Sequence, residues 1–133
     1  MQNLLWIAVA VFVIAMISYL MNSRQKYEEK EDTISIIGTN GIYKGKTIPV
    51  MDEIVIGRDA EKCSVVYPND AAGVSSVHCR LRAEENKVEL TDEASTYGTY
   101  RENGERLAPG KSYYLEAGES FYIGDRKNTF LIK

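Results

Sequence analysis

Three short segments of the sequence combine glycine with residues that can hold a phosphate group. They are residues 56–58, 73–78 and 95–100, which read IGR, GVSSVH and STYGTY. The guanidinium of Arg58 can donate two parallel hydrogen bonds to phosphate oxygens, and hydroxyls and loop N–H groups can bind the remaining oxygens. Because each segment follows a strand-like run, the sequence predicts a phosphate-binding site built from loops.

The same inventory argues against catalysis and metal binding. His78 is the only histidine, and no cysteine stands at a metal-ligand spacing from it. The sequence also lacks a nucleophile elbow, a glycine-rich phosphate loop with lysine and a paired-carboxylate motif. We therefore predict a binding protein and not an enzyme, with no catalytic residue, no metal and no cofactor.

The segments that must position these loops have the pattern of short strands. Ten β-type runs follow one another between residues 33 and 133: TISII, KTIPV, EIVIG, SVVY, HCRLRAE, KVELT, GTYR, SYYL, ESFYIG and NTFLIK. Alternation is clearest where Cys79 and Leu81 are expected to point inward while Arg80 and Arg82 face water. No window supports a helix of about ten residues. The pattern predicts an all-β sandwich of about 10–11 strands.

The order of the loop segments resembles that of the forkhead-associated (FHA) domain. The family order is GR, then SxxH, then DxxSxxGT, then NG followed by a leucine. Here these elements are Gly57-Arg58, residues 75–78, residues 92–99, and Asn103-Gly104 with Leu107. The resemblance covers almost the whole of residues 33–133, and it implies an FHA-type (SMAD/FHA-like) β-sandwich that binds phosphothreonine peptides.

The resemblance implies a role for each matching polar residue. Arg58 matches the arginine that contacts the phosphate, and Ser75 matches the hydroxyl that hydrogen-bonds to it. Thr96 matches a residue that faces the phosphothreonine, and Ser76 stands where the family often has an asparagine that contacts the peptide backbone. Arg58 itself is expected to face solvent in the free domain.

Other matching positions are expected to support the loops or to alter specificity. Gly57, His78 and Gly98 correspond to positions that hold the loops in shape. Tyr97 stands where the family commonly has asparagine, and we expect it to contact the peptide. Gly73 stands where some members have a basic residue that determines specificity, so the resemblance does not indicate which residues are recognised beside the phosphothreonine.

The N-terminal residues predict a membrane anchor. Residues 4–21, which begin with Leu4 and end with Met21, are 18 consecutive residues without a charge. At ~1.5 Å per residue they nearly match a hydrocarbon core of ~30 Å. Trp6 and Tyr19 lie near the two ends, where aromatic rings favour the interfaces. A cleaved signal peptide would carry a basic start and a small-residue cleavage site, and neither is found.

The flanking charges predict the orientation of this anchor. Arg24, Lys26 and Lys30 follow the span, and basic residues are retained on the cytoplasmic side. Cys63 and Cys79 are too few for a disulfide framework and are expected to be buried free thiols. We predict an anchor at residues 1–21 with its N-terminus outside the cell membrane, a charged tether at 22–32, and a cytoplasmic FHA domain at 33–133.

The net charge bears on the kind of partner. The formal charge is −3, and no basic stripe is visible, so nucleic acid is not expected as a ligand. The sequence predicts a membrane-anchored module that recruits phosphothreonine proteins, such as a Ser/Thr kinase or its substrate. The alternative is a phosphate-independent docking subunit of a membrane-bound secretion or cell-envelope complex. The oligomeric state is not predicted.

Overall fold

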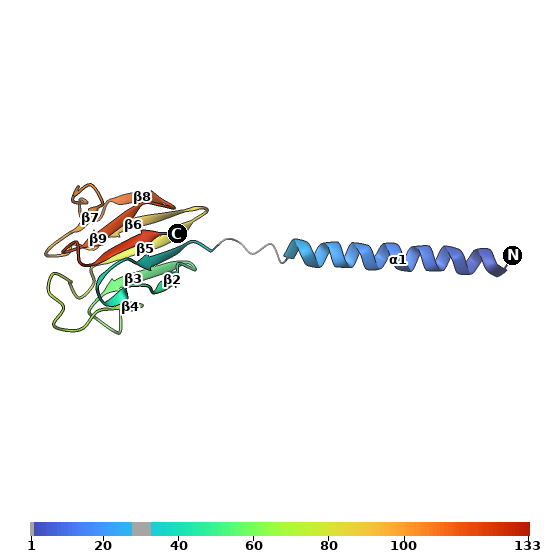
Figure 1. Cartoon of the computed structure of the whole chain (residues 1–133), viewed down its shortest axis with the longest axis horizontal. Helices are drawn as coiled ribbons and strands as arrows, with labels where there is room; N and C mark the ends of the chain where they lie inside the picture. Colours follow the sequence, from blue (N-terminus) through green and yellow to red (C-terminus); the bar gives the residue numbers. More distant parts are fainter. Residues whose placement is uncertain (1, 28–32) are drawn as a thin grey trace. The chain divides into compact units, whose positions relative to one another are not determined.

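The computed structural model describes residues 2–27 and 33–133 and divides into two compact units (Figure 1). The first unit is Met1–Asp32, and its helix α1 spans Gln2–Tyr27. Within it, Asn3–Ser23 has a mean hydropathy of 2.6, which makes it a candidate membrane span. The helix continues through residues 22–27, where a tether was expected, because no glycine or proline interrupts that stretch. The remainder of the expected tether, residues 28–32, lies outside the described residues.

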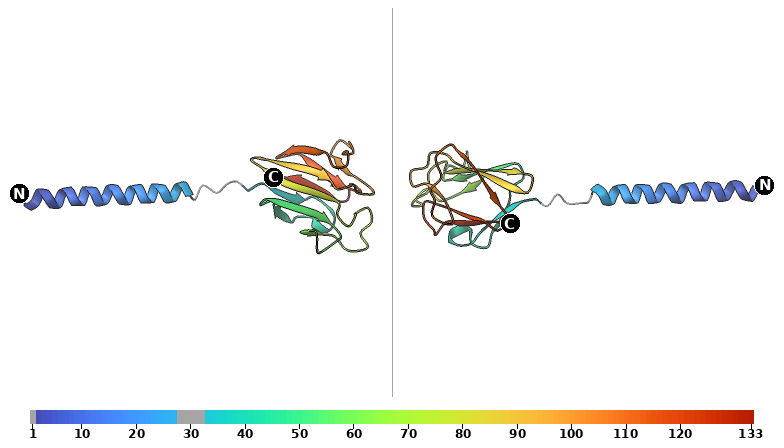
Figure 2. Two further views of the ribbon diagram at one scale, coloured as in Figure 1. Left: turned by 180° about the vertical axis from the view of Figure 1, so that it is seen from behind. Right: turned by 90° about the horizontal axis from the view of Figure 1, so that it is seen from above.

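The second unit, Thr33–Lys133, is a sandwich of two five-stranded sheets (Figures 1 and 2). The first sheet has the order β2-β1-β10-β9-β7, and its strands are Thr47–Pro49, Ser35–Gly38, Thr129–Ile132, Ser120–Ile123 and Thr99–Arg101. The second sheet has the order β4-β3-β5-β6-β8, and its strands are Val65–Val66, Glu53–Gly57, Cys79–Glu84, Lys87–Asp92 and Ser112–Glu116. A short 3-10 helix, η1, spans Gly41–Tyr43. Each of the ten predicted runs contains a strand, and the predicted all-β sandwich is confirmed.

The core lies between the sheets and contains the residues that alternation placed inward. Cys79, Leu81, Val88 and Leu90 of the second sheet are fully buried. The first sheet contributes Ile36, Phe121, Ile123, Phe130 and Ile132, and the rings of Phe121 and Phe130 stack at 5.5 Å. Both cysteines are buried and free, as expected. Packing of these apolar side chains is the main favourable contribution to folding.

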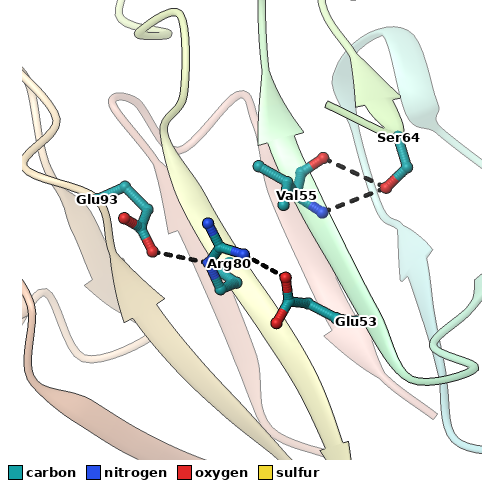
Figure 3. A network of polar contacts seen from close by, with 5 residues as sticks. All are labelled: Glu53, Val55, Ser64, Arg80 and Glu93. Atoms are coloured by element: carbon teal, nitrogen blue, oxygen red, sulfur yellow. Dashed lines mark hydrogen bonds and ion pairs between the residues drawn. The ribbon is translucent and has the colours of Figure 1, made fainter. Parts of the chain in front are cut away.

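The outer face of the second sheet carries an ion-pair network. Arg80 on the central strand β5 contacts Glu53 on β3 and, at 2.9 Å, Glu93 just after β6 (Figure 3). On the neighbouring part of β3, the Ser64 hydroxyl oxygen accepts a hydrogen bond from the Val55 backbone N–H (Figure 3). Exposed ion pairs contribute only about 0–1 kcal/mol each. The Arg80 charge is thus matched by two carboxylates.

The strand registers bring four loops to one end of the sandwich. Ile56 at the end of β3 pairs with Cys79 at the start of β5, which in turn pairs with Asp92 at the end of β6. In the other sheet, Thr99 at the start of β7 pairs with Ile123 at the end of β9. The segments after β3, before β5, between β6 and β7, and after β9 therefore meet at this end.

Candidate functional site

The first wall of the site forms where the end of β3 meets the loop before β5. The N–H groups of Arg58 and Asp59 donate to the carbonyl oxygens of Ser75 and Ser76, at 3.1 and 3.0 Å. This close approach requires a residue without a side chain at position 57, since a Cβ on Gly57 would lie 2.3 Å from the Ser76 oxygen. The support role expected of Gly57 thus has a steric reason.

The side chain of Arg58 is held by the domain itself. Its Nε donates to the Val74 carbonyl oxygen at 2.6 Å, and its Nη1 donates to the Asn69 carbonyl oxygen at 2.7 Å. The residue is half-buried. Arg58 was expected to face solvent, but it is only partly exposed, because the carbonyl oxygens of Val74 and Asn69 accept hydrogen bonds from its guanidinium. The remaining guanidinium N–H groups stay available to a ligand.

His78 connects two of the loops from a fully buried position. Its Nδ1 accepts the Ser75 backbone N–H at 3.0 Å, so Nε2 carries the proton and donates to the Gly98 carbonyl oxygen at 2.8 Å. Burial lowers the pKa of the imidazole, since the charged form is poorly solvated there. Both ring nitrogens are occupied within the domain, which agrees with the loop-supporting role predicted for His78.

Ser75 and Thr96 meet across this junction. The Ser75 hydroxyl oxygen accepts the Thr96 backbone N–H at 3.0 Å. Within residues 2–27 and 33–133, no acceptor is found for the hydroxyl proton of Ser75, so that proton is free to point toward a ligand. Thr96 itself is exposed. Ser75 is thus bonded to both Arg58 and Thr96, two residues that lie far apart in the sequence.

Asp92 organises the loop of residues 93–98 and was not given a role from the sequence. Its buried carboxylate accepts hydrogen bonds from the Ser95 hydroxyl at 2.5 Å, from the Thr99 hydroxyl at 2.7 Å and from the Ser95 N–H at 3.1 Å. The Ser95 oxygen then accepts the Gly98 N–H at 3.0 Å. The DxxS spacing was the available signal, because aspartate commonly accepts bonds from the backbone a few residues onward.

Ser76 and Tyr97 lie on the same loops, with their side chains toward solvent. Ser76 is exposed, and its carbonyl oxygen also accepts the Cys63 thiol at 3.2 Å. The Tyr97 ring is 60% exposed, and its carbonyl oxygen accepts the Tyr100 hydroxyl at 2.7 Å. The loop backbones are fixed, but no recorded side-chain bond joins Ser76 or Tyr97 to Arg58 within the described part of the chain.

An acidic hollow of about 380 Å³ adjoins Arg58 and Ser76. Asp59, Ala60, Glu61 and Asn69 complete its lining.

The backbones of Gly73 and Gly124 lie close together. Gly73 has a φ of +80°, and a Cβ on Gly124 would lie 2.2 Å from the Gly73 carbonyl oxygen. The backbones of these two loops are thus in contact where some FHA domains carry a basic side chain.

Several solved structures resemble this chain, among them FHA domains. The FHA domain of CT664 from Chlamydia trachomatis is 17% identical with a TM-score of 0.64, covering 76% of this chain and 96% of that one. The MEK1 FHA domain in complex with a HOP1 phosphothreonine peptide is 23% identical with a TM-score of 0.57, covering 75% and 94%. The cytoplasmic domain of PscD, a T3SS sorting platform protein of P. aeruginosa, is 16% identical with a TM-score of 0.60, covering 76% and 79%.

At the level of sequence, comparison with curated proteins returns no match. The model of the FHA domain family, in contrast, matches residues 54–124, which is more than half of the chain. The matched range begins in β3 and ends just after β9, and it contains Arg58, Ser75, His78 and Thr96. Strands β1, β2 and β10 lie outside the matched range but complete the first sheet. The chain therefore belongs to the FHA domain family.

Proposed function

We propose that the domain binds phosphothreonine peptides, with Arg58, Ser75 and Thr96 at the phosphothreonine. The observation that carries the proposal is that Ser75 joins the two other segments: its carbonyl oxygen accepts the Arg58 backbone N–H, and its hydroxyl oxygen accepts the Thr96 N–H. The Arg58 guanidinium and the Ser75 hydroxyl keep further donors for a ligand. A phosphothreonine brings about −1.5 to −2 charges and three acceptor oxygens near neutral pH, so it requires charge-assisted donors of this kind. The phosphothreonine peptide bound by the MEK1 FHA domain supports the same reading.

In this proposal the flanking residues of the peptide meet Ser76 and Tyr97. Ser76 offers a hydroxyl to the peptide backbone, and the exposed Tyr97 ring offers an apolar face with a polar hydroxyl at its edge. Gly57, His78 and Gly98 support the loops without touching the peptide. His78 does this through bonds within the domain, to the Ser75 N–H and the Gly98 carbonyl oxygen.

We further propose that the apolar helix anchors this domain to the cell membrane. The span Asn3–Ser23 is long and apolar enough to cross, and the basic residues that follow it favour an N-terminus outside and a domain in the cytoplasm. The protein would then recruit partners phosphorylated by a Ser/Thr kinase to the cytoplasmic face of the membrane.

The second candidate is a phosphate-independent docking subunit of a membrane-bound assembly. The likeness to the cytoplasmic domain of PscD, a T3SS sorting platform protein, is the observation that favours it. The donors that Arg58 and Ser75 keep favour phosphate binding instead, because a phosphate needs charge-assisted donors and a phosphate-independent contact does not.

Titration of phosphothreonine peptides separates these functions. The full chain in detergent micelles is mixed with a fluorescent library in which phosphothreonine is fixed and the neighbours are degenerate. Phosphoserine and unphosphorylated threonine versions serve as controls. We expect saturable binding of the phosphothreonine library alone. Equal binding of all three libraries, or of none, would support phosphate-independent docking and contradict the proposal.

A further inference from the structure

A second arginine, Arg106, lies against the loop that carries Thr96. Its Nη2 is 3.3 Å from the Thr96 carbonyl oxygen, and the N–H of the same Thr96 is bonded to Ser75. The arginine stem passes over Gly98, where a Cβ would lie 2.7 Å from the Arg106 Nε. The glycine of the DxxSxxGT segment therefore leaves space for Arg106 beside the site.

The guanidinium of Arg106 packs against a pair of stacked aromatic rings. The Arg106 guanidinium lies 6.0 Å from the ring centre of Tyr100, which stacks on Tyr122 at 4.9 Å with 10° between the ring planes. The Tyr100 hydroxyl is bonded to the Tyr97 carbonyl oxygen, and Arg126 covers Tyr122 at 4.8 Å. Arg106 therefore packs against a pair of stacked rings, and one of these rings, Tyr100, is bonded to the loop that carries Thr96.

The positive charge of Arg106 is not neutralised within the domain. Of the arginines in residues 33–133, Arg80 and Arg101 pair with glutamates, whereas Arg58, Arg82, Arg106 and Arg126 have no carboxylate partner. Among these four, it is Arg106 that bonds the Thr96 carbonyl oxygen. Arg106 is exposed and uses one long hydrogen bond, so most of its N–H groups face solvent. An arginine with free N–H groups recognises carboxylates and phosphates through its planar fork.

We propose that Arg106 is a specificity-determining residue that binds an anionic side chain close to the phosphothreonine in the same peptide. The anion is an aspartate or glutamate, or a second phosphorylated residue, since both present oxygen pairs to a guanidinium. This inference rests on the proposed function. The acidic hollow lined by Asp59 and Glu61 adjoins Arg58 and Ser76, not Thr96, so the preference for an anion applies only to peptide positions that reach Arg106.

A position scan of phosphothreonine peptides tests the assignment. Glutamate is placed at each flanking position of an otherwise alanine peptide, and affinity for the full chain in detergent micelles is measured. We expect one or two positions at which glutamate tightens binding by about two- to five-fold, the measured range of an exposed ion pair, with the gain reduced in high salt. Phosphoserine is then placed at the same position. A larger gain from phosphoserine than from glutamate assigns the preference to a second phosphate, and a smaller or equal gain assigns it to a carboxylate.

Charge variants supply the controls. Arg106→Gln should abolish the gain while still binding the alanine peptide, and Arg106→Glu should favour lysine at the same position. Arg82→Gln removes an equal charge from an exposed site on β5 and should keep the gain. If Arg106→Gln weakened every peptide equally, Arg106 would have only a structural role and the assignment would be overturned. The assignment would also be overturned if glutamate still tightened binding to Arg106→Gln. A wild-type chain that binds no phosphothreonine peptide overturns this inference together with the proposed function.

Discussion

The hydroxyl oxygen of Ser75 lies 3.0 Å from the backbone nitrogen of Thr96 and joins the loop before β5 to the loop before β7. Because the Ser75 oxygen is the acceptor in this bond, the hydroxyl proton is still available to a ligand. Ser75→Ala should therefore weaken phosphothreonine binding by about ten- to a hundred-fold, the range expected for losing a hydrogen bond to a charged group. Ser75→Thr keeps the hydroxyl and should retain most of the affinity. Equal affinities for wild type and Ser75→Ala in a peptide titration would contradict this role.

Arg58→Ala should reduce both binding and stability. Loss of a charge-assisted contact costs about 2–5 kcal/mol, so affinity should fall by roughly 30-fold or more. Because Arg58 also bonds the carbonyl oxygens of Val74 and Asn69, the free energy of unfolding should drop by about 1–3 kcal/mol. Urea unfolding of residues 33–133, which have their own core, measures this change.

The control for Arg58 is Arg82→Ala. Arg82 is exposed, so its truncation should alter stability by no more than about 0.5 kcal/mol and leave binding unchanged. If Arg58→Ala unfolded at the same urea concentration as wild type, the carbonyl bonds of Arg58 would not stabilise the free domain.

Stability should depend on pH through His78. Burial lowers the pKa of the folded imidazole, whereas an unfolded histidine titrates near ~6.5. The unfolded chain then binds the extra proton first, so the free energy of unfolding is fully present above about pH 6.5 and decreases as the pH falls below it. Urea unfolding of residues 33–133 between about pH 5.5 and 7.5 measures the slope, since carboxylates titrate mainly below this window. His78→Gln should be less stable but show little slope, and an unchanged slope in that variant would assign the dependence to other groups.

Gly57→Ala should reduce both the stability of the domain and its affinity for the peptide, although the φ of Gly57 is not positive. Position 57 has no positive φ, but a Cβ there would overlap the Ser76 backbone, so we expect a loss of about 1–3 kcal/mol and at least a tenfold loss of affinity. Gly45→Ala is the control, because Gly45 has a φ of +77° with no atom near its Cβ position. It should cost about 1–2 kcal/mol of stability and leave peptide affinity unchanged. Equal affinities of both variants would show that the contact between β3 and residues 75–78 does not shape the site.

The proposed orientation predicts the side from which the helix ends can be labelled. Cysteine replaces Asn3 or Ser23, which begin and end the candidate span. In sealed right-side-out vesicles, a membrane-impermeant thiol reagent should label Asn3→Cys and should reach Ser23→Cys only after the bilayer is opened. Cys63 and Cys79 are buried and give little background. Labelling of Ser23→Cys from outside would reverse the proposed topology.

The sequence alone was sufficient to predict the class of fold and to select the loop segments that carry the candidate site residues. Alternation such as that of Cys79 and Leu81 predicts strands because successive side chains of a strand point to opposite faces. An uncharged stretch such as residues 4–21 predicts an apolar helix for a similarly local reason. The order of the Arg58, Ser75 and Thr96 segments identified the loops, because residue type and spacing are properties of the chain itself.

Only the tertiary structure decided how these residues act on one another. Arg58 is held by Val74 and Asn69, His78 bridges Ser75 to Gly98, and Arg106 lies against Thr96. Tyr122 is buried, with the ring of Tyr100 stacked on it and the guanidinium of Arg126 4.8 Å from its ring centre. Each of these contacts joins segments that become neighbours only when the two sheets pack and their loops close at one end. Local patterns fix which face a residue occupies, but which loop lies beside it follows from strand order and register.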